Sequence, residues 1–173
     1  MTSGFGGFCY ADPGPALLSW HWTGPLARHI TETTGATVVP TGVVYNYHRD
    51  GDGSPLHNDP FATELVVLTL LDGPVEPLLL HPDLADAPLV EVGALSERTG
   101  GHPTGGIPFD IRPTPLLMSG QAIPHHRHPA SRDTEVVVAA QFFGVLASLT
   151  SGTARWRDSA ARGVPGSARQ LSR

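Results

Sequence analysis

The chain has 173 residues and one cysteine, Cys9, so it is long enough for one domain with a buried core but has no internal disulfide. Its 20 glycines and 17 prolines, with only 16% charged residues, exclude a helical bundle or a coiled coil. Up to residue 150 it carries six arginines against fifteen acidic residues, a net charge of −9 that argues against duplex nucleic acid as a partner.

Within the first 35 residues, one short helix is expected. Residues 1–18 are rich in glycine and proline and have no clear period. From Thr23 to Gly35, a proline at position 25, apolar Leu26 and Ile30 on one side, and the glycine as a stop predict a helix. We expect segment 1–35 to serve as the lid of the domain.

The rest of the chain has the pattern of an all-β domain. Short β-branched or leucine-rich runs recur between turn clusters. They lie at residues 36–39, 42–48, 64–71, 75–81, 89–92, 107–111, 116–118, 122–128 and 135–146. Strands at this spacing, with no helical pattern between them, predict a sandwich, jelly roll or barrel, and the glycine-rich stretch 96–106 is expected to be a functional loop.

The composition of the two ends of the chain predicts its domain limits and its location in the cell. Residues 151–173 hold five arginines among alanine, serine and glycine, so we expect a flexible tail after a domain that spans residues 1–150. No apolar run is long enough to span a membrane, and the N-terminus lacks the pattern of a signal peptide. These features predict a cytoplasmic protein with no membrane partner.

The first segment with candidate chemistry follows the strand at 42–48. The chain passes through a polar stretch, where Asp50-Gly51 is expected to be a hairpin turn, and continues to His57-Asn58-Asp59. In an extended segment, residues two apart point to the same side. The imidazole of His57 and the carboxylate of Asp59 can therefore converge on one metal ion.

The second segment holds three histidines, at positions 125, 126 and 128, beside a strongly apolar strand. Any one of them can supply a third ligand. Two imidazoles and one carboxylate on one face of an octahedral metal leave three positions open, as in non-haem iron(II) oxygenases. Open positions allow oxygen and an organic molecule to bind together.

These segments resemble the iron(II)- and 2-oxoglutarate-dependent dioxygenases of the prolyl hydroxylase and dealkylase branches. The resemblance rests on residues 45–59, the apolar strand 64–71, and the motifs Ser119-Gly120 and Ile123-Pro124-His125 before the last long strand. It covers roughly residues 40–145 and implies a double-stranded β-helix. It also implies the metal ligands His57, Asp59 and His125, because a proline follows the third of these by four residues as in the family; His126 and His128 remain alternatives.

The resemblance also implies a site for 2-oxoglutarate. The family binds the distal carboxylate with an arginine of an Arg-x-Ser or Arg-x-Thr pair, which Arg132 and Thr134 match, although two or three residues earlier than usual. Arg127 is the alternative. Asn46 stands where the dealkylase-like branch has a cosubstrate-binding asparagine, and His48 stands where that branch has a tyrosine.

The implied enzyme is an iron(II) oxygenase that couples 2-oxoglutarate decarboxylation to hydroxylation, or a related C–H oxidation, of a small-molecule or amino-acid-like substrate. We expect its apolar pocket to be walled by Trp20, Trp22, Phe142 and Phe143. His21 and Arg28 are candidates to meet a polar group of the substrate. The chain is short for this family, so a homodimer in which the partner covers the barrel mouth is a further expectation.

Two alternatives remain open from the sequence. Gly51, His57-x-Asp59 and Glu64 loosely follow the first motif of the cupins, in which Glu64 would be a fourth ligand. A cupin-type dioxygenase or isomerase that does not use 2-oxoglutarate would then be favoured. The other alternative is a metal-free β-sandwich that binds a ligand or a protein.

Overall fold

The structure is a computed structural model that describes residues 2–3, 9–131 and 135–151. Its helices are α1 (Pro15–Thr23), α2 (Leu26–Thr34), α3 (Leu89–Arg98) and α4 (Leu146–Ser151), with a 3-10 helix at Pro82–Leu84. Its strands are β1 (Thr2–Ser3), β2 (Cys9–Ala11), β3 (Val38–His48), β4 (Ser54–His57), β5 (Leu65–Asp72), β6 (Leu78–Leu80), β7 (Ile107–Phe109), β8 (Leu116–Met118), β9 (His125–Arg127) and β10 (Val136–Val145).

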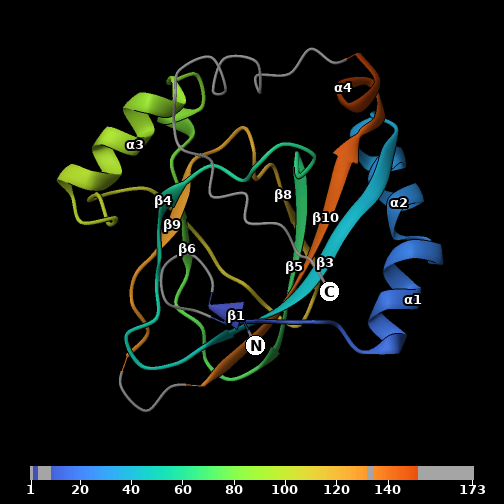
Figure 1. The fold of residues 1–173 in the computed structure, drawn as a ribbon, viewed down its shortest axis with the longest axis horizontal. Helices are drawn as coiled ribbons and strands as arrows, with labels where there is room; N and C mark the ends of the chain where they lie inside the picture. Colours follow the sequence, from blue (N-terminus) through green and yellow to red (C-terminus); the bar gives the residue numbers. More distant parts are fainter. Residues whose placement is uncertain (1, 4–8, 132–134, 152–173) are drawn as a thin grey trace.

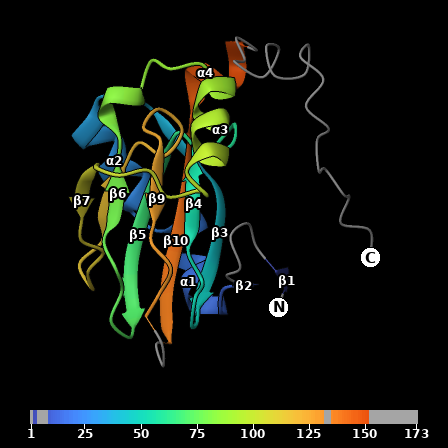
Figure 2. The same ribbon diagram turned by 90° about the vertical axis from the view of Figure 1, so that its left-hand side faces the viewer.

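The strands form two antiparallel sheets that face each other (Figures 1 and 2). The larger sheet has the order β1-β2-β3-β10-β5-β8, and the smaller has the order β4-β9-β6-β7. From β3 to β10 the chain passes repeatedly from one sheet to the other. This winding is that of a double-stranded β-helix, so the predicted jelly-roll fold is confirmed.

Apolar side chains from both sheets fill the space between them. Val66 and Leu68 of β5 pack with Val138 of β10, with Leu78 of the smaller sheet, and with Met118 of β8 in one buried cluster. Full burial of each such side chain contributes roughly 1.5–3 kcal/mol to the stability of the fold. This cluster lines the inside of the barrel next to the candidate site.

A second core lies on the outer face of the larger sheet. Val67 points away from its neighbours in β5 and packs with Phe143, Val38 and Ile30. Helices α1 and α2 lie on this side of the sheet (Figure 1). Buried on both faces, β5 and β10 have nearly continuous apolar sequences instead of an apolar–polar alternation.

The helix predicted at residues 23–35 is present as α2. Gly35 ends it in the left-handed conformation, with a φ of 72°, and its N–H donates a hydrogen bond to the carbonyl of Thr31 at 2.9 Å. Helix α1 was not predicted. Its sequence has no apolar face: Trp20 and Trp22 are half-exposed, whereas His21 between them is fully buried.

The expected strand at residues 89–92 is wrong, because these residues begin α3. Pro88 precedes the helix, and its carbonyl accepts hydrogen bonds from the N–H groups of Glu91 and Val92 at 2.8 and 3.2 Å. Only Val92 is buried, while Leu89 and Val90 are exposed. The β propensity of leucine and valine is overridden here: the helix satisfies its backbone internally and packs against β4.

The other strand predictions hold with shifted limits. The runs at 36–39 and 42–48 form the single strand β3, whose pairing with β10 is shifted between Phe142 and Phe143. A turn is present at Asp50-Gly51, where Gly51 has a φ of 75° and the N–H of Asp52 donates to the carbonyl of Arg49 at 2.8 Å. It is not the expected hairpin turn, because β3 and β4 belong to different sheets. None of the helices in the described ranges is long and apolar enough to cross a membrane.

Candidate metal centre

The pairing of β4 with β9 brings the two polar segments of the sequence together. In the antiparallel register, His57 at the end of β4 lies opposite His125 at the start of β9. Their ring centroids are 4.4 Å apart. Residues separated by 68 positions thus become neighbours, with Asp59 beside both.

Both imidazoles present the same ring nitrogen to the carboxylate. His57 Nδ1 donates a hydrogen bond to the carbonyl of Pro55 at 2.7 Å, and His125 Nδ1 donates to the carbonyl of Ile123 at 2.9 Å. Each Nε2 is therefore left with a lone pair, at 3.6 Å (His57) and 3.8 Å (His125) from Asp59 Oδ1. Backbone partners that fix the tautomer in this way are typical of metal-binding histidines.

Asp59 is held in place by the turn that precedes β9. Its N–H donates to the carbonyl of Gly120 at 3.0 Å, and the neighbouring Asn58 donates through Nδ2 to the carbonyl of Gln121 at 2.9 Å. A Cβ at Gly120 would overlap Asp59 Oδ2 and lie 2.9 Å from Cγ2 of Val66. The absent side chain at position 120 is what leaves room for the carboxylate.

Burial keeps the third candidate ligand uncharged. Desolvation, followed by the nearby His57, lowers the pKa of His125 from 6.5 to about 4, although Asp59 acts in the opposite direction. The side chain of His125 is only 5% exposed. A neutral imidazole is the form that binds a metal, so this environment favours the ligand over the protonated ring.

One ligand atom each from His57, Asp59 and His125 can be chosen so that the three atoms lie within 4.8 Å of one another. His126 and His128 point to the other face of β9, so of the three neighbouring histidines it is His125 that joins His57 and Asp59. The arrangement can hold a divalent cation through two imidazoles and one carboxylate.

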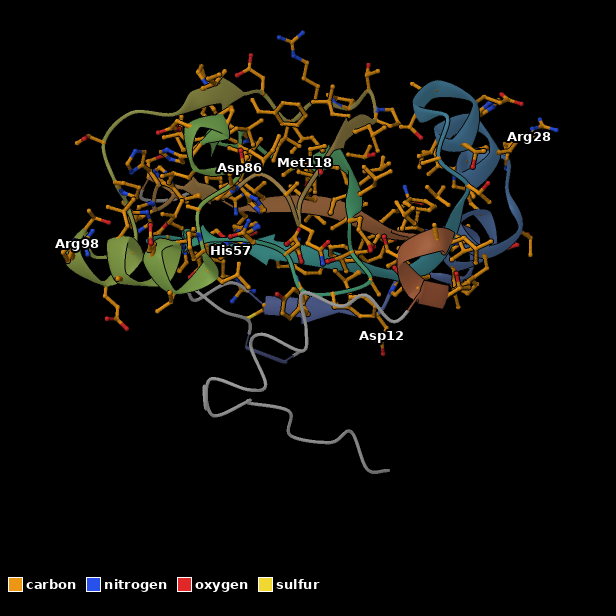
Figure 3. All side chains as sticks on the ribbon, turned by 90° about the horizontal axis from the view of Figure 1, so that it is seen from above. Asp12, Arg28, His57, Asp86, Arg98 and Met118 are labelled. Carbon is orange, nitrogen blue, oxygen red and sulfur yellow. The ribbon has the colours of Figure 1, made fainter. Side chains whose placement is uncertain are left out.

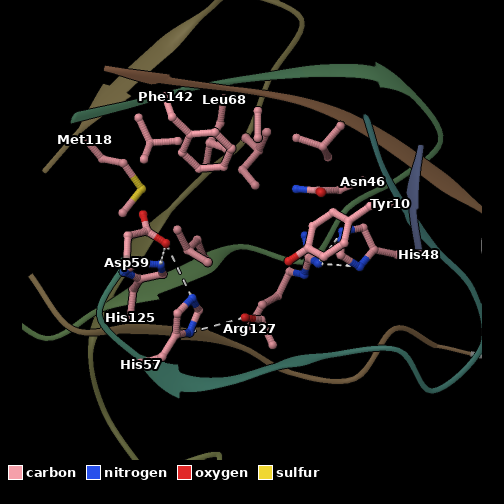
Figure 4. A pocket seen from close by; sticks show the side chains of 16 residues that line it. Tyr10, Asn46, His48, His57, Asp59, Leu68, Met118, His125, Arg127 and Phe142 are labelled. Atoms are coloured by element: carbon pink, nitrogen blue, oxygen red, sulfur yellow. Dashed lines mark hydrogen bonds and ion pairs between the residues drawn. The ribbon is translucent and has the colours of Figure 1, made fainter. Parts of the chain in front are cut away.

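These groups line a pocket inside the barrel that opens to solvent. Figure 4 shows the triad at one end, and Arg127 and His48 at the other, with Tyr10 beside them. The apolar wall between the ends comes from both sheets. It consists of Val66, Leu68, Leu78, Ile111, Met118, Val138, Ala140 and Phe142.

Arg127 is a buried cation at the end of this pocket. It lies two residues after the distal histidine, on the same face of β9, and is 6% exposed. Burial lowers its pKa to about 10, although the charge of Asp52 acts in the opposite direction, so the guanidinium remains charged at neutral pH. No carboxylate of the described residues forms a close ion pair with it. Its Nη2 lies 2.6 Å from Nδ1 and 2.7 Å from Nε2 of His48.

The environment of His48 makes it a neutral acceptor. Burial, followed by the positive charge of Arg127, lowers the pKa of His48 from 6.5 to about 3. Asn46, two residues earlier on β3, also lines the pocket, and its Oδ1 is buried without a hydrogen-bond partner among the described residues. Arg132 and Thr134, which the sequence predicts as cosubstrate ligands, lie outside the described residues.

Several other predicted site residues lie elsewhere. Of the four aromatic residues expected to wall the pocket, only Phe142 does so: Phe143 belongs to the second core, and Trp20 and Trp22 are half-exposed on α1. His21 is buried against Phe143, with ring centroids 5.0 Å apart. Figure 3 shows Arg28 at the outer edge of the molecule, away from the His57 region.

The structure also separates Glu64 from the triad. Its Oε2 accepts a hydrogen bond from the N–H of Val145 at 3.3 Å, and it does not line the pocket. The four-ligand arrangement of the cupin alternative therefore has no support. Tyr10 lines the pocket but was missed, because it lies in a glycine-rich stretch whose sequence has no strand pattern.

The comparisons with known proteins find the same fold. No protein-family model matches the chain, and no curated protein matches it in sequence. An oxidoreductase of the 2OG-Fe(II) oxygenase family from Burkholderia pseudomallei superposes with a TM-score of 0.54 at 13% identity, over 75% of this chain and 55% of that one. SnoN, a non-heme α-ketoglutarate-dependent epimerase from nogalamycin biosynthesis, gives 0.58 at 15% identity, over 84% and 66%.

HygX from Streptomyces hygroscopicus, solved with nickel, 2-oxoglutarate and hygromycin B bound, gives a TM-score of 0.56 at 11% identity, over 80% of this chain and 74% of that one. At these identities the likeness establishes the fold. The chain spans only about half the length of the Burkholderia protein and two thirds of SnoN. The expected resemblance is thus confirmed at the level of the double-stranded β-helix.

The glycine beside the carboxylate gives a first prediction. Gly120→Ala is expected to displace Asp59 and weaken the binding of Mn²⁺, used as an air-stable probe, by about 10- to 100-fold, a loss typical of disturbed ligand support. Titration of the metal-free protein measures this. Gly93→Ala on α3, where a Cβ meets nothing within 4 Å, is the matched control and should bind Mn²⁺ normally. Unchanged binding in a folded Gly120→Ala protein would contradict the account of Asp59.

The lowered pKa of His48 gives a second prediction. Between pH 6.5 and about 3, the unfolded chain binds a proton that the folded chain does not, so the free energy of unfolding falls as the pH drops through this range. By pH 5 this one residue lowers the free energy of unfolding by up to about 2 kcal/mol. His48→Gln should flatten the decline in urea denaturation series from pH 7.5 to 4.5. His29→Gln, at an exposed histidine, should not; equal slopes for all three proteins would refute the assignment.

Proposed function

We propose that this protein is an iron(II)- and 2-oxoglutarate-dependent oxygenase that acts on a small organic molecule. The observation that carries the proposal is a single pocket with a two-histidine, one-carboxylate donor set at one end and a buried arginine without an ion pair among the described residues at the other. A metal-bound 2-oxo acid with a distal carboxylate complements both ends. The fold shared with solved 2-oxoglutarate oxygenases supports the same proposal.

The donor set fits iron(II). His57 and His125 offer their Nε2 atoms, and Asp59 offers a carboxylate oxygen that faces both. Three protein ligands on one face leave room for two atoms of a 2-oxo acid and for oxygen. Bound here, iron(II) would supply the oxygen activation that the decarboxylation of 2-oxoglutarate drives. The protein's own contribution is to hold the donors, orient the bound molecules and exclude water.

Arg127 is our candidate for the distal carboxylate of 2-oxoglutarate. A guanidinium can donate two parallel hydrogen bonds to a carboxylate, and a buried cation without an ion pair gains most from such a partner. The neutral ring of His48 supports the guanidinium without neutralising it. Arg132, favoured by its Arg-x-Thr context, is the alternative donor for the same carboxylate.

The substrate class follows from the rest of the pocket. The wall is mostly apolar, with Asn46 and Tyr10 as polar groups, and the space suits a small molecule instead of a folded macromolecule. HygX holds hygromycin B in its solved structure, and SnoN belongs to nogalamycin biosynthesis. We infer a small-molecule substrate of comparable kind and leave the reaction as hydroxylation or a related C–H oxidation.

Chelation of 2-oxoglutarate gives the direct test, because it needs no knowledge of the substrate. Under anaerobic conditions, the protein with iron(II) should develop the visible charge-transfer band of a 2-oxo acid bound to iron(II). In air, it should convert 2-oxoglutarate to succinate. His57→Ala and Asp59→Ala should remove the band and the turnover, because each deletes a ligand.

Glu64→Gln is the matched control for these variants. It keeps an acceptor for the N–H of Val145 and leaves the triad untouched, so it should retain both band and turnover. Loss of iron in Glu64→Gln would favour the cupin-type enzyme. A band that persists in a folded His57→Ala protein would refute the proposed centre.

The two candidate arginines can be separated by the affinity for 2-oxoglutarate. Arg127→Met should raise its Kd by about 30-fold or more, because truncating one partner of a buried charge pair costs at least roughly 2 kcal/mol. Iron binding and the affinity for 2-oxopentanoate, which lacks the distal carboxylate, should change little. Band titration measures all three quantities.

Arg132→Met and Arg49→Met serve as comparisons for this measurement. Arg49 is exposed, so its replacement should have no effect. A rise in Kd confined to Arg132→Met would show that Arg132, and not Arg127, binds the distal carboxylate. If neither Arg127→Met nor Arg132→Met weakened the binding of 2-oxoglutarate, the proposed cosubstrate would be wrong.

A further inference from the structure

Strand β9 carries a second histidine cluster on the face opposite the pocket. Because side chains alternate along a strand, His125 and Arg127 point into the barrel while His126 points to the other face. His128 follows directly after the strand, with its ring against that of His126. His102 joins them from the loop that follows α3. The ring centroids of His126 and His128 are 5.1 Å apart, and His102 lies 5.8 and 5.5 Å from them.

These three residues, which we call the outer histidine cluster, have donor atoms that converge. One ring nitrogen from each can be chosen so that all three lie within 4.8 Å of one another. The atoms of His57, Asp59 and His125 meet the same limit. In the described part of the chain, these are the two groups with this property.

Two of the three rings have buried nitrogens that lack any hydrogen-bond partner within the described ranges. His126 has no exposed surface, and its Nε2 is unpartnered. The Nδ1 of His102 is also buried and unpartnered. Buried polar atoms are normally satisfied, and an ion that binds both atoms would account for them.

A fourth histidine orients the buried ring. His81 stacks on His126 with ring centroids 5.0 Å apart, and its Nε2 lies 3.0 Å from His126 Nδ1. When His126 Nδ1–H donates to this nitrogen, His126 Nε2 keeps its lone pair and faces the cluster. His81 is itself fixed, because its N–H donates to the carbonyl of Pro124 at 2.8 Å. A hydrogen bond of this kind to the second nitrogen is typical support for a metal ligand.

The loop that carries His102 is held against the neighbouring strand. The N–H of Leu56 in β4 donates to the carbonyl of Gly101 at 2.7 Å. Gly101 has a φ of 88°, and a Cβ there would lie 2.6 Å from Cβ of Pro55. Only glycine permits this approach, which places His102 next to β9 before any ligand binds.

We propose that His102, His126 and His128 bind a zinc-class divalent cation at a site separate from the pocket. Three neutral imidazoles without a carboxylate suit Zn²⁺, Co²⁺, Ni²⁺ or Cu²⁺ and not Mg²⁺ or Ca²⁺. His128 is exposed, so the fourth position of a tetrahedral ion is open to water on that side. The cation joins the loop after α3 to β9, the strand whose inner face holds His125, and acts as a structural link.

The test uses the full chain with the pocket site disabled, so that its outcome is independent of the proposed function. The metal-free double variant His57→Ala/Asp59→Ala should bind one Zn²⁺ per chain and should unfold at a higher temperature when Zn²⁺ is added. Adding His102→Ala or His128→Ala should weaken zinc binding by about 100-fold or more and remove the thermal shift. Position 128 is exposed, so its replacement leaves the core intact.

His29→Ala in the same double variant is the matched control, since His29 is an exposed histidine on α2. It should keep the full zinc affinity. Co²⁺ gives an independent readout, because a four-coordinate site absorbs visible light far more strongly than a six-coordinate one. Zinc binding that is absent from the double variant, or equal in the His102→Ala, His128→Ala and His29→Ala proteins, would overturn the proposal.

Discussion

The antiparallel pairing of β4 with β9 holds the whole site together. It sets His57 opposite His125 and brings the turn at Gly120 against the backbone of Asp59. Side chains alternate with a period of two, so a slip of one residue would exchange the two faces of β9. His126 would then enter the barrel, and Arg127 would leave it. The register therefore determines the donor set and the buried cation together.

The pocket places opposite charges at its two ends within an apolar barrel. Asp59 supplies a carboxylate at one end and Arg127 a guanidinium at the other, while His48 and His125 are kept neutral by burial. Isolated buried charges are costly. Among the described residues, the Arg127 guanidinium has no close ion-pair partner, and the Asp59 carboxylate faces two imidazoles. A divalent cation with a bound dicarboxylate would complement both ends. The charges at the two ends of the pocket thus favour the same cosubstrate as the fold.

The same strand has a different chemistry on each face. The inner face joins histidine to a carboxylate, a mixed donor set that suits iron(II); the outer face gathers only imidazoles, which suit a softer cation. Two close approaches make this possible, at Gly120 beside Asp59 and at Gly101 beside Pro55. In both places a side chain would push the donor-bearing segment away. Glycine thus has a positional role at each cluster that its neighbours in the sequence do not reveal.

The β class and the shared face of His57 and Asp59 could be predicted from the amino-acid sequence, because both depend on local rules: turn residues end strands, and residues two apart point to one side. The family motif favours His125 and leaves His126 and His128 as alternatives; the register with a strand 68 residues away is what sets His125 opposite His57. The motif favours Arg132, which lies outside the described residues; among the described arginines, Arg127 is the buried one. Residues 89–92 begin a helix that packs against β4, although their composition favours a strand. Contacts between distant segments decided these points, and no local pattern encodes them.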